Sequence, residues 1–150
     1  MLAILSNSLN FSLRLTGATD RDAFSFLCDG EVNKSDEMAK KYFSESQEQF
    51  FKSPEKNLMI DMKKTNLHDT RVNFFQTECW SMDLTTVEKL FELACHSDVE
   101  SESSVLNVVS VRDKCSYFFS NHRSLLDFMK SLYPGAVAVS PQGLQLRSRC

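Results

Sequence analysis

Few residues of the chain have the types and spacing that enzyme chemistry needs. A hydrolase needs a nucleophile beside a base, and the sequence holds neither a Gly-x-Ser-x-Gly turn nor a glycine-rich loop for phosphates or dinucleotides. Cys115 and His122 could form a nucleophile–base pair, but a buried cysteine and a surface histidine is the simpler interpretation. His96 lacks further ligands at metal-binding spacing. The sequence therefore predicts a protein that is not an enzyme and that holds no metal and no cofactor.

Two short aspartate motifs point to regulation instead. A Gly-x-x-Asp step ends at Asp20, where an alternating strand pattern gives way to a helix start. Asp61 lies within a short apolar run, and Asp69-Thr70 follows eight residues after it. A hydroxyl at a helix N-terminus can cap the helix, and the helix dipole tolerates a phosphate there. Phosphorylation of such a hydroxyl adds roughly −1.5 to −2 charges and alters any interface built around it.

These motifs together resemble the STAS domain, the fold of bacterial anti-sigma factor antagonists, over about residues 1–70. The resemblance implies an N-terminal hairpin, then a helix, then a central strand with an apolar-Asp-apolar step. It also implies that Thr70, at the start of the next helix, is the residue that a partner kinase phosphorylates. Asp69 would be the acidic position before it, with Asp61 and Asp20 completing the switch. The segments 20–57 and 70–105 are longer than is usual in that family.

The elements that would position these residues follow from hydrophobic periodicity. Period-two alternation predicts a strand over 9–15, paired with 1–5 as a hairpin. Residues 70–82 fit either a helix or a strand, because β-prone side chains occur there without clean alternation. The other expected strands are 58–62 and 105–111, followed by a terminal hairpin of 136–139 and 144–146, and the expected helices start near residues 19, 35, 85 and 124.

The interleaved order predicts an α/β or α+β fold: one single domain over 1–150, with helices packed on a single mixed sheet and a C-terminal β-hairpin. If residues 70–80 form a helix, the order is STAS-like. If they form a strand, the first 112 residues follow the β-α-β-β-α-β order of a ferredoxin-like fold. That layout hosts many functions and cannot select one.

The composition excludes some classes of binding partner. The chain has 150 residues, 17 basic and 20 acidic side chains and a net charge of −3, so it lacks the basic face that nucleic acid needs. Its apolar runs fall short of the roughly 20 residues that span a bilayer. Five scattered cysteines without Cys-x-x-Cys spacing are typical of the reducing cytoplasm.

The sequence thus predicts a non-enzymatic, cytoplasmic regulatory domain. It would be STAS-like, switched by phosphorylation at Thr70, and would bind another protein (a regulator, kinase or target) rather than nucleic acid or a membrane. The alternative is a ferredoxin-like or other α+β interaction module of the immunity, adaptor or effector type that binds one protein partner. The sequence leaves the oligomeric state open.

Overall fold

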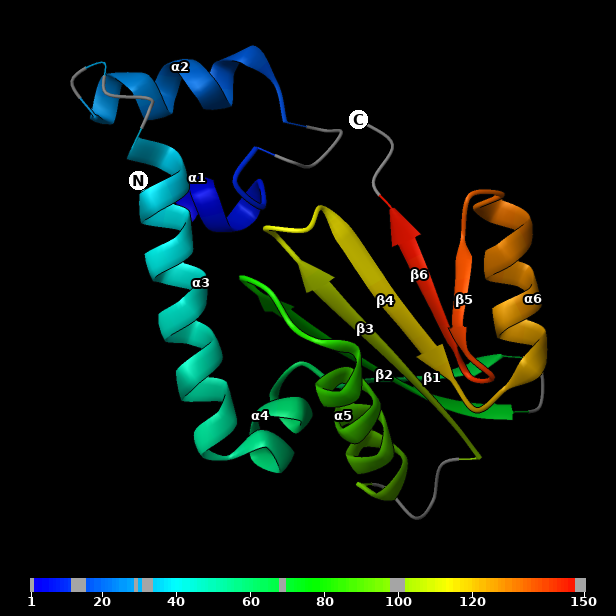
Figure 1. Ribbon diagram of the computed structural model, residues 1–150. Coiled ribbons are helices and arrows are strands. Elements are labelled where there is room, and N and C mark those ends of the chain that lie inside the picture. The colour runs from blue at the N-terminus through cyan, green and yellow to red at the C-terminus, as the bar shows by residue number, and fades with distance from the viewer. Residues whose placement is uncertain are drawn as a thin grey trace.

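The computed structural model describes residues 2–11, 16–28, 30, 34–67, 70–97 and 102–147, which build one six-stranded mixed sheet with helices on both faces (Figure 1). The strands are β1 (Lys63–Leu67), β2 (Thr70–Cys79), β3 (Ser103–Ser110), β4 (Cys115–Ser120), β5 (Val137–Ser140) and β6 (Gly143–Arg147). The helices are α1 (Leu2–Asn7), α2 (Ala18–Leu27), α3 (Ser35–Lys52), α4 (Pro54–Ile60), α5 (Leu84–His96) and α6 (Arg123–Leu132).

The sheet has the strand order β1-β2-β3-β4-β6-β5. Strands β2 and β3 are parallel, and α5 is the crossover that a parallel pair requires. The other four pairings are antiparallel, including the β1–β2 hairpin and the terminal β5–β6 hairpin. Strand β1 pairs only with residues 70–74, so the second half of β2 extends beyond its partner.

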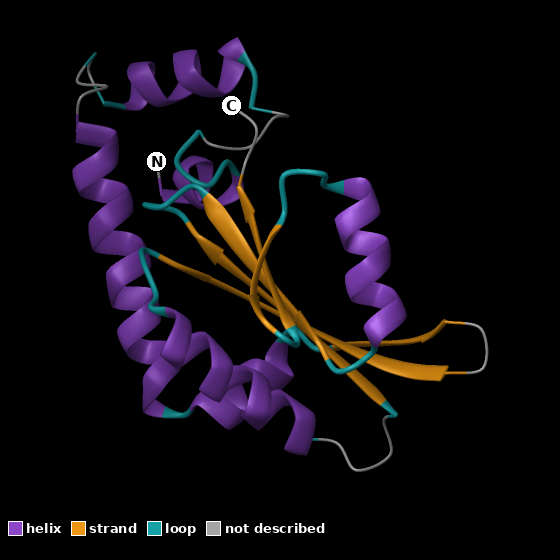
Figure 2. Cartoon of the chain, turned by 45° about the vertical axis from the view of Figure 1, so that its right-hand side comes forward, coloured by secondary structure: helices purple, strands orange, loops and turns teal. Residues whose placement is uncertain are grey.

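Different helices cover the two faces of the sheet (Figure 2). On one face, α5 buries Val87, Leu90, Phe91 and Ala94 against β2, β3 and β4, and α4 adds Leu58. On the opposite face, α6 inserts Leu126 among side chains of β2, β3, β4 and β6. Helix α5 begins where Asp83 accepts a hydrogen bond from the Thr86 amide at 2.9 Å.

Helices α1, α2 and α3 form a third cluster beside the sheet, around Leu5, Phe24 and Phe43. Leu9, Asn10 and Phe11 follow α1 in the left-handed region, with φ of 47°, 52° and 61°. The ring of Phe11 meets that of Phe24 edge-on at 5.3 Å between centroids, which fixes this turn against α2. Val111 and the partly buried Val109 join the cluster to the sheet.

The predicted fold class is confirmed: one open mixed sheet carries packed helices and ends in a β-hairpin. The helices expected from residues 85 and 124 are present as α5 and α6, and the strand expected over 105–111 is β3. Residues 70–79 form a strand, which settles the ambiguous segment. No observation tests whether residues 1–150 are a single domain, so that stays a prediction.

Three expected strand assignments are corrected. Residues 2–7 form α1 rather than a hairpin strand, and residues 9–11 turn through left-handed backbone; residues 12–15 lie outside the described part. The apolar run 58–62 falls mainly in α4, because Pro54 occupies the first turn, where a missing amide costs nothing. The order is not ferredoxin-like either, because residues 2–7 form a helix instead of a first strand, and β2 and β3 are direct parallel neighbours in the sheet.

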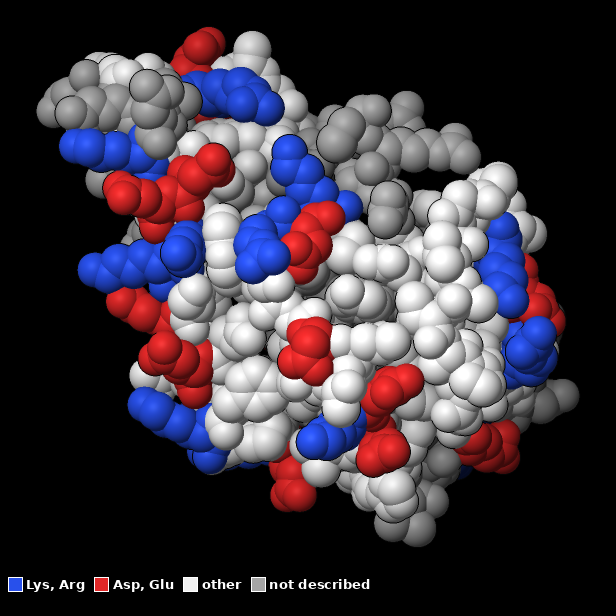
Figure 3. Space-filling model, viewed as in Figure 1, with Lys and Arg blue, Asp and Glu red and all other residues white. Residues whose placement is uncertain are grey.

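Charges of both signs lie side by side on the surface shown in Figure 3, notably along α3, and no large region of that view is of one sign. Within the described residues, no helix combines the length and apolar character needed to cross a bilayer.

Candidate functional site

A cleft of about 700 Å³ opens over the sheet between α3 and α6. Its floor comes from β2, β3, β4 and β6. Tyr42, Ser46 and Phe50 line it from α3, and Met129 and Tyr133 line it from the α6 side. Polar and apolar side chains share the lining, as in sites that enclose an organic ligand.

The sheet register arranges the floor in rows. Phe74 pairs with Val105 in one row, and Gln76, Asn107 and Phe118 occupy adjacent strands in the next. In the third row Glu78 lies opposite Val109, which pairs with Ser116. Neighbouring strands are about 4.8 Å apart and alternate residues share a face, so these side chains form one contiguous surface.

Several polar groups of this floor are accessible to a ligand. Gln76 is exposed, and Asn107 and Ser116 are half-buried. Among the described residues, neither the Asn107 amide nor the Ser116 hydroxyl has a hydrogen-bond partner. Because an amide offers donors and an acceptor, Asn107 can bind both kinds of ligand atom.

Glu78 is the titratable group that the cleft perturbs most clearly. Its burial raises the pKa of the carboxyl group, and the charge of Asp61 raises it further, while a hydrogen bond with Gln76 opposes the shift. A carboxyl group with a raised pKa can hold a proton nearer neutral pH and give it up again, as an acid–base group requires. Asp61 lies just after α4, and Lys63, at the start of β1, is the cation among the described residues that line the cleft.

The described lining of the cleft contains two carboxylates, Asp61 and Glu78. No three His, Cys, Asp or Glu side chains in the described ranges converge closely enough to share an ion. The described residues of the cleft are therefore suited to contacting a ligand and transferring a proton.

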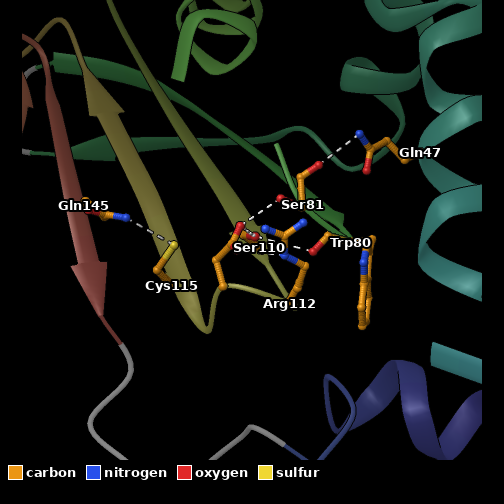
Figure 4. A network of polar contacts seen from close by, with 8 residues as sticks. Gln47, Trp80, Ser81, Ser110, Arg112, Cys115 and Gln145 are labelled. Atoms are coloured by element: carbon orange, nitrogen blue, oxygen red, sulfur yellow. Dashed lines mark hydrogen bonds and ion pairs between the residues drawn. The ribbon is translucent and has the colours of Figure 1, made fainter. Parts of the chain in front are cut away.

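A second polar cluster closes the carboxyl ends of β2 and β3 (Figure 4). Asp113 accepts hydrogen bonds from Ser110 at 2.6 Å and Ser81 at 2.9 Å, and its carboxylate pairs with Arg112 at 3.2 Å. These bonds, the Ser110 one above all, lower the pKa of Asp113. Gln47 of α3 donates to the Ser81 carbonyl at 3.2 Å, which ties the helix to this end of the sheet. The polar groups of this cluster are hydrogen-bonded to one another, so the cluster stabilises this end of the sheet.

The buried thiol of Cys79 is not activated. Burial, together with nearby acidic groups, raises the pKa of Cys79 to about 12, so its thiol stays protonated at neutral pH. Cys115 is buried at one end of β4, whereas His122 follows the other end of that strand. The two residues therefore cannot form a catalytic pair, as the sequence indicated.

The structure separates the residues predicted as a phosphorylation switch. Thr70 is half-buried at the start of β2, so its expected place at a helix N-terminus is wrong. Asp20 lies in the first turn of α2, where it accepts a hydrogen bond from the Gly17 amide at 2.9 Å. Asp61 lines the cleft, and Asp69 is outside the described residues. Whether these residues act as a site is not tested and stays a prediction.

Sequence reasoning missed Gln76, Glu78, Asn107 and Ser116. Gln76 and Glu78 lie in β2, which the sequence left ambiguous. Asn107 lies in β3, which was predicted without its register, and Ser116 lies in β4, which was not predicted. The available signal in β2 was its run of β-prone side chains, because the burial of the polar Asn73 leaves no clean alternation in the sequence.

Comparison with known proteins supports a different relationship from the one predicted. No protein-family model matches the chain, and no curated protein matches it. The chain is similar in structure to a protein of Methanococcus jannaschii that is provisionally assigned as a family II inorganic pyrophosphatase, with a TM-score of 0.65 and 14% sequence identity. The match covers 99% of this chain and 48% of that structure, so the chain spans about half the length of the protein it resembles. At this identity the match shows the fold alone.

This match corrects the functional expectations. It does not support a STAS-domain resemblance, and the β1–β2 hairpin occupies the place where that fold needed a helix after Thr70. The protein it matches is assigned as an enzyme, which contradicts the expectation of a non-enzymatic regulatory or interaction domain. The error arose from two short motifs whose local sequence fits a strand end and a helix cap in many folds.

Proposed function

We propose that the chain is a substrate-facing domain of a phosphoanhydride hydrolase. The observation that carries this proposal is the match of nearly the whole chain to one half of a protein assigned as a pyrophosphatase. The cleft between α3 and α6 is the part of this half that faces substrate, and a second protein element, corresponding to the other half, completes the site. Such an element takes the place of the protein partner expected from the sequence.

The cleft supports this role through Glu78 and Lys63. Hydrolysis of a phosphoanhydride adds water at one phosphorus and breaks the bridging P–O bond, and the departing phosphate oxygen gains a proton. Glu78, with its raised pKa, would supply or accept that proton, and Lys63 would offset the charge of a phosphate group. Metal ions, if the reaction uses them, would be held with ligands from the completing element.

The test is phosphate release from inorganic pyrophosphate, and from nucleoside triphosphates as further phosphoanhydrides, in the presence of Mg²⁺ or Mn²⁺. It uses the protein purified under mild conditions from the cells that make it, with any bound polypeptide retained. We expect turnover, and we expect Glu78→Gln and Lys63→Ala each to lower kcat/KM by about tenfold or more. Gln49→Leu, an exposed change on α3 outside the cleft, is the matched control. Absence of turnover, or equal turnover in all three variants, would refute the proposal.

A cytoplasmic location also remains part of this proposal. It is supported by the free thiols of Cys28, Cys79, Cys95 and Cys115, because such cysteines persist in a reducing compartment.

A further inference from the structure

We propose that the cleft recognises a planar heteroaromatic group, so that the substrate is a nucleotide-like phosphoanhydride rather than inorganic pyrophosphate alone. This inference rests on the proposed function for the phosphoanhydride part. It adds the identity of the group that fills most of the cleft.

The size of the cleft is the first argument. A volume of about 700 Å³ lies within the range of roughly 300–1,000 Å³ that encloses drug-sized organic ligands. Inorganic pyrophosphate is much smaller than such ligands. A hydrolase that acted on it alone would leave most of the space between α3 and α6 unused.

The chemistry of the floor is the second argument. Half-buried Phe74 lies one row from Gln76 on β2, and Asn107 lies beside Gln76 on β3, so an aromatic ring and two amides lie within about two strand spacings. Phe118, which pairs with Asn107, is buried and packs on Leu126 of α6. Tyr42 and Tyr133 add aromatic rings from opposite walls. Aromatic side chains stack on a base, and amides bind the donors and acceptors of its edge.

The unmatched polar groups are the third argument. The Asn107 amide is without a hydrogen-bond partner in the described part of the chain, although it sits half-buried in the middle of the floor. A half-buried amide gains most from a ligand that supplies both a donor and an acceptor. A nucleobase edge does so, whereas a phosphate oxygen supplies acceptors only.

Charge is the fourth argument. Among the described residues that line the cleft, Asp61 and Glu78 are acidic and Lys63 is the one cation. Sites for free polyphosphate anions depend on several Arg or Lys side chains. A neutral ring is compatible with this lining, while the phosphate end of the same ligand can lie toward Lys63 and the completing element.

The experiment titrates the ¹⁵N-labelled 150-residue chain with adenosine, guanosine, cytidine and uridine, which carry no phosphate. Benzyl alcohol, which has an aromatic ring without ring nitrogens, is the control ligand. We expect saturable binding of at least one nucleoside, with the side-chain amide signals of Asn107 and Gln76 among those that shift. Benzyl alcohol should bind more weakly by about tenfold or more.

Two variants sharpen the test. Asn107→Leu keeps a similar side-chain size and should weaken nucleoside binding by about tenfold, while Gln49→Leu should leave it unchanged. The amide spectrum of each variant reports whether it is folded, and Ser116→Ala provides a smaller change in the same floor. Equal affinity for benzyl alcohol, no nucleoside binding up to the solubility limit, or equal binding by Asn107→Leu and Gln49→Leu overturns the inference.

The outcome separates this inference from the proposed function. Pyrophosphate hydrolysis without nucleoside binding overturns the inference and leaves the hydrolase proposal standing. Nucleoside binding by the chain, with no phosphate release from the native protein, supports the recognition and overturns the hydrolase proposal.

Discussion

Replacing Gly143 with alanine should destabilise the protein by overpacking the sheet. Gly143 of β6 pairs directly with Phe119 of β4. A methyl group on Gly143 would lie 2.6 Å from Cε1 and 2.9 Å from Cε2 of that ring. Phe119 is only 1% exposed and packs on Phe91 of α5, with ring centroids 5.5 Å apart, so the ring has no free space into which to move.

The expected cost is about 2–3 kcal/mol of unfolding free energy, the upper part of the range for overpacked cores. For a chain of this length each kcal/mol lowers Tm by about 2–4 °C, so Tm should fall by about 4–12 °C. Urea unfolding and calorimetry measure the two quantities. Gly135→Ala is the matched control, because its methyl group would meet no atom within 4 Å, and its stability should stay within about 0.5 kcal/mol of the parent.

A double-mutant cycle tests the stated cause. Phe119→Leu costs stability itself, but it removes the ring that a methyl group on Gly143 would strike. In that background Gly143→Ala should cost much less than it does in the parent. A Gly143→Ala protein as stable as the parent, or an equal cost in both backgrounds, would show that the contact with Phe119 is not the cause.

Three further substitutions have clear expected outcomes. Leu58→Ala, at a fully buried site of α4, should lower unfolding free energy by about 2–5 kcal/mol in urea titrations, whereas Met59→Ala, at a 39% exposed site, should cost far less. The pKa of Asp113 is held below its ordinary value. Its stabilising effect is therefore present at neutral pH and is lost as pH falls through the lowered pKa of the folded state. Asp113→Asn should be less stable at pH 7 and show a weaker acid-side loss, and an unchanged acid limb contradicts this. The pKa of Glu78 is raised instead, so its contribution is full at low pH and declines as pH rises through the folded-state value. Glu78→Gln should therefore gain stability relative to the parent as pH rises from acid to neutral, and parallel pH profiles would exclude the effect.

The helices on the sheet and the terminal hairpin could be predicted because their signals are local. The apolar stripe of Val87, Leu90, Phe91 and Ala94 specifies the buried face of α5 without knowledge of its partner. The turn through Pro141 and Gly143 indicated the hairpin in the same way. Each signal lies within one element and its own caps.

The remaining errors came from segments whose state depends on distant packing. Leu58, Met59 and Ile60 are apolar enough for a buried strand, but only Leu58 is buried and the other two face outward from a short helix. Strand β4 was not predicted, although Phe118 and Phe119 lie in it on opposite faces, each covered by a different helix. A strand buried on both faces has no alternating pattern to reveal it.

The candidate site could not be predicted because it depends on register. Gln76 and Asn107 become neighbours only when β2 and β3 pair in parallel, and no local pattern states which residues face each other. Asp61 was singled out for a strand end that does not exist, yet it lies in the cleft. The sequence selected this acidic residue, but it placed Asp61 at the end of a strand instead of the end of α4.

The parallel pairing of β2 with β3 also has a kinetic consequence. Val72 of β2 and Ser103 of β3 pair only after the long segment between them, which contains α5, has closed into a loop. The β1–β2 and β5–β6 pairs close over short turns. Closing long loops slows folding, so docking of β3 beside β2 should be the rate-limiting event, with the hairpins formed earlier. In stopped-flow refolding, Val105→Ala should then slow folding more than it speeds unfolding. The strand pair that builds the floor of the cleft would thus be among the last parts of the molecule to assemble.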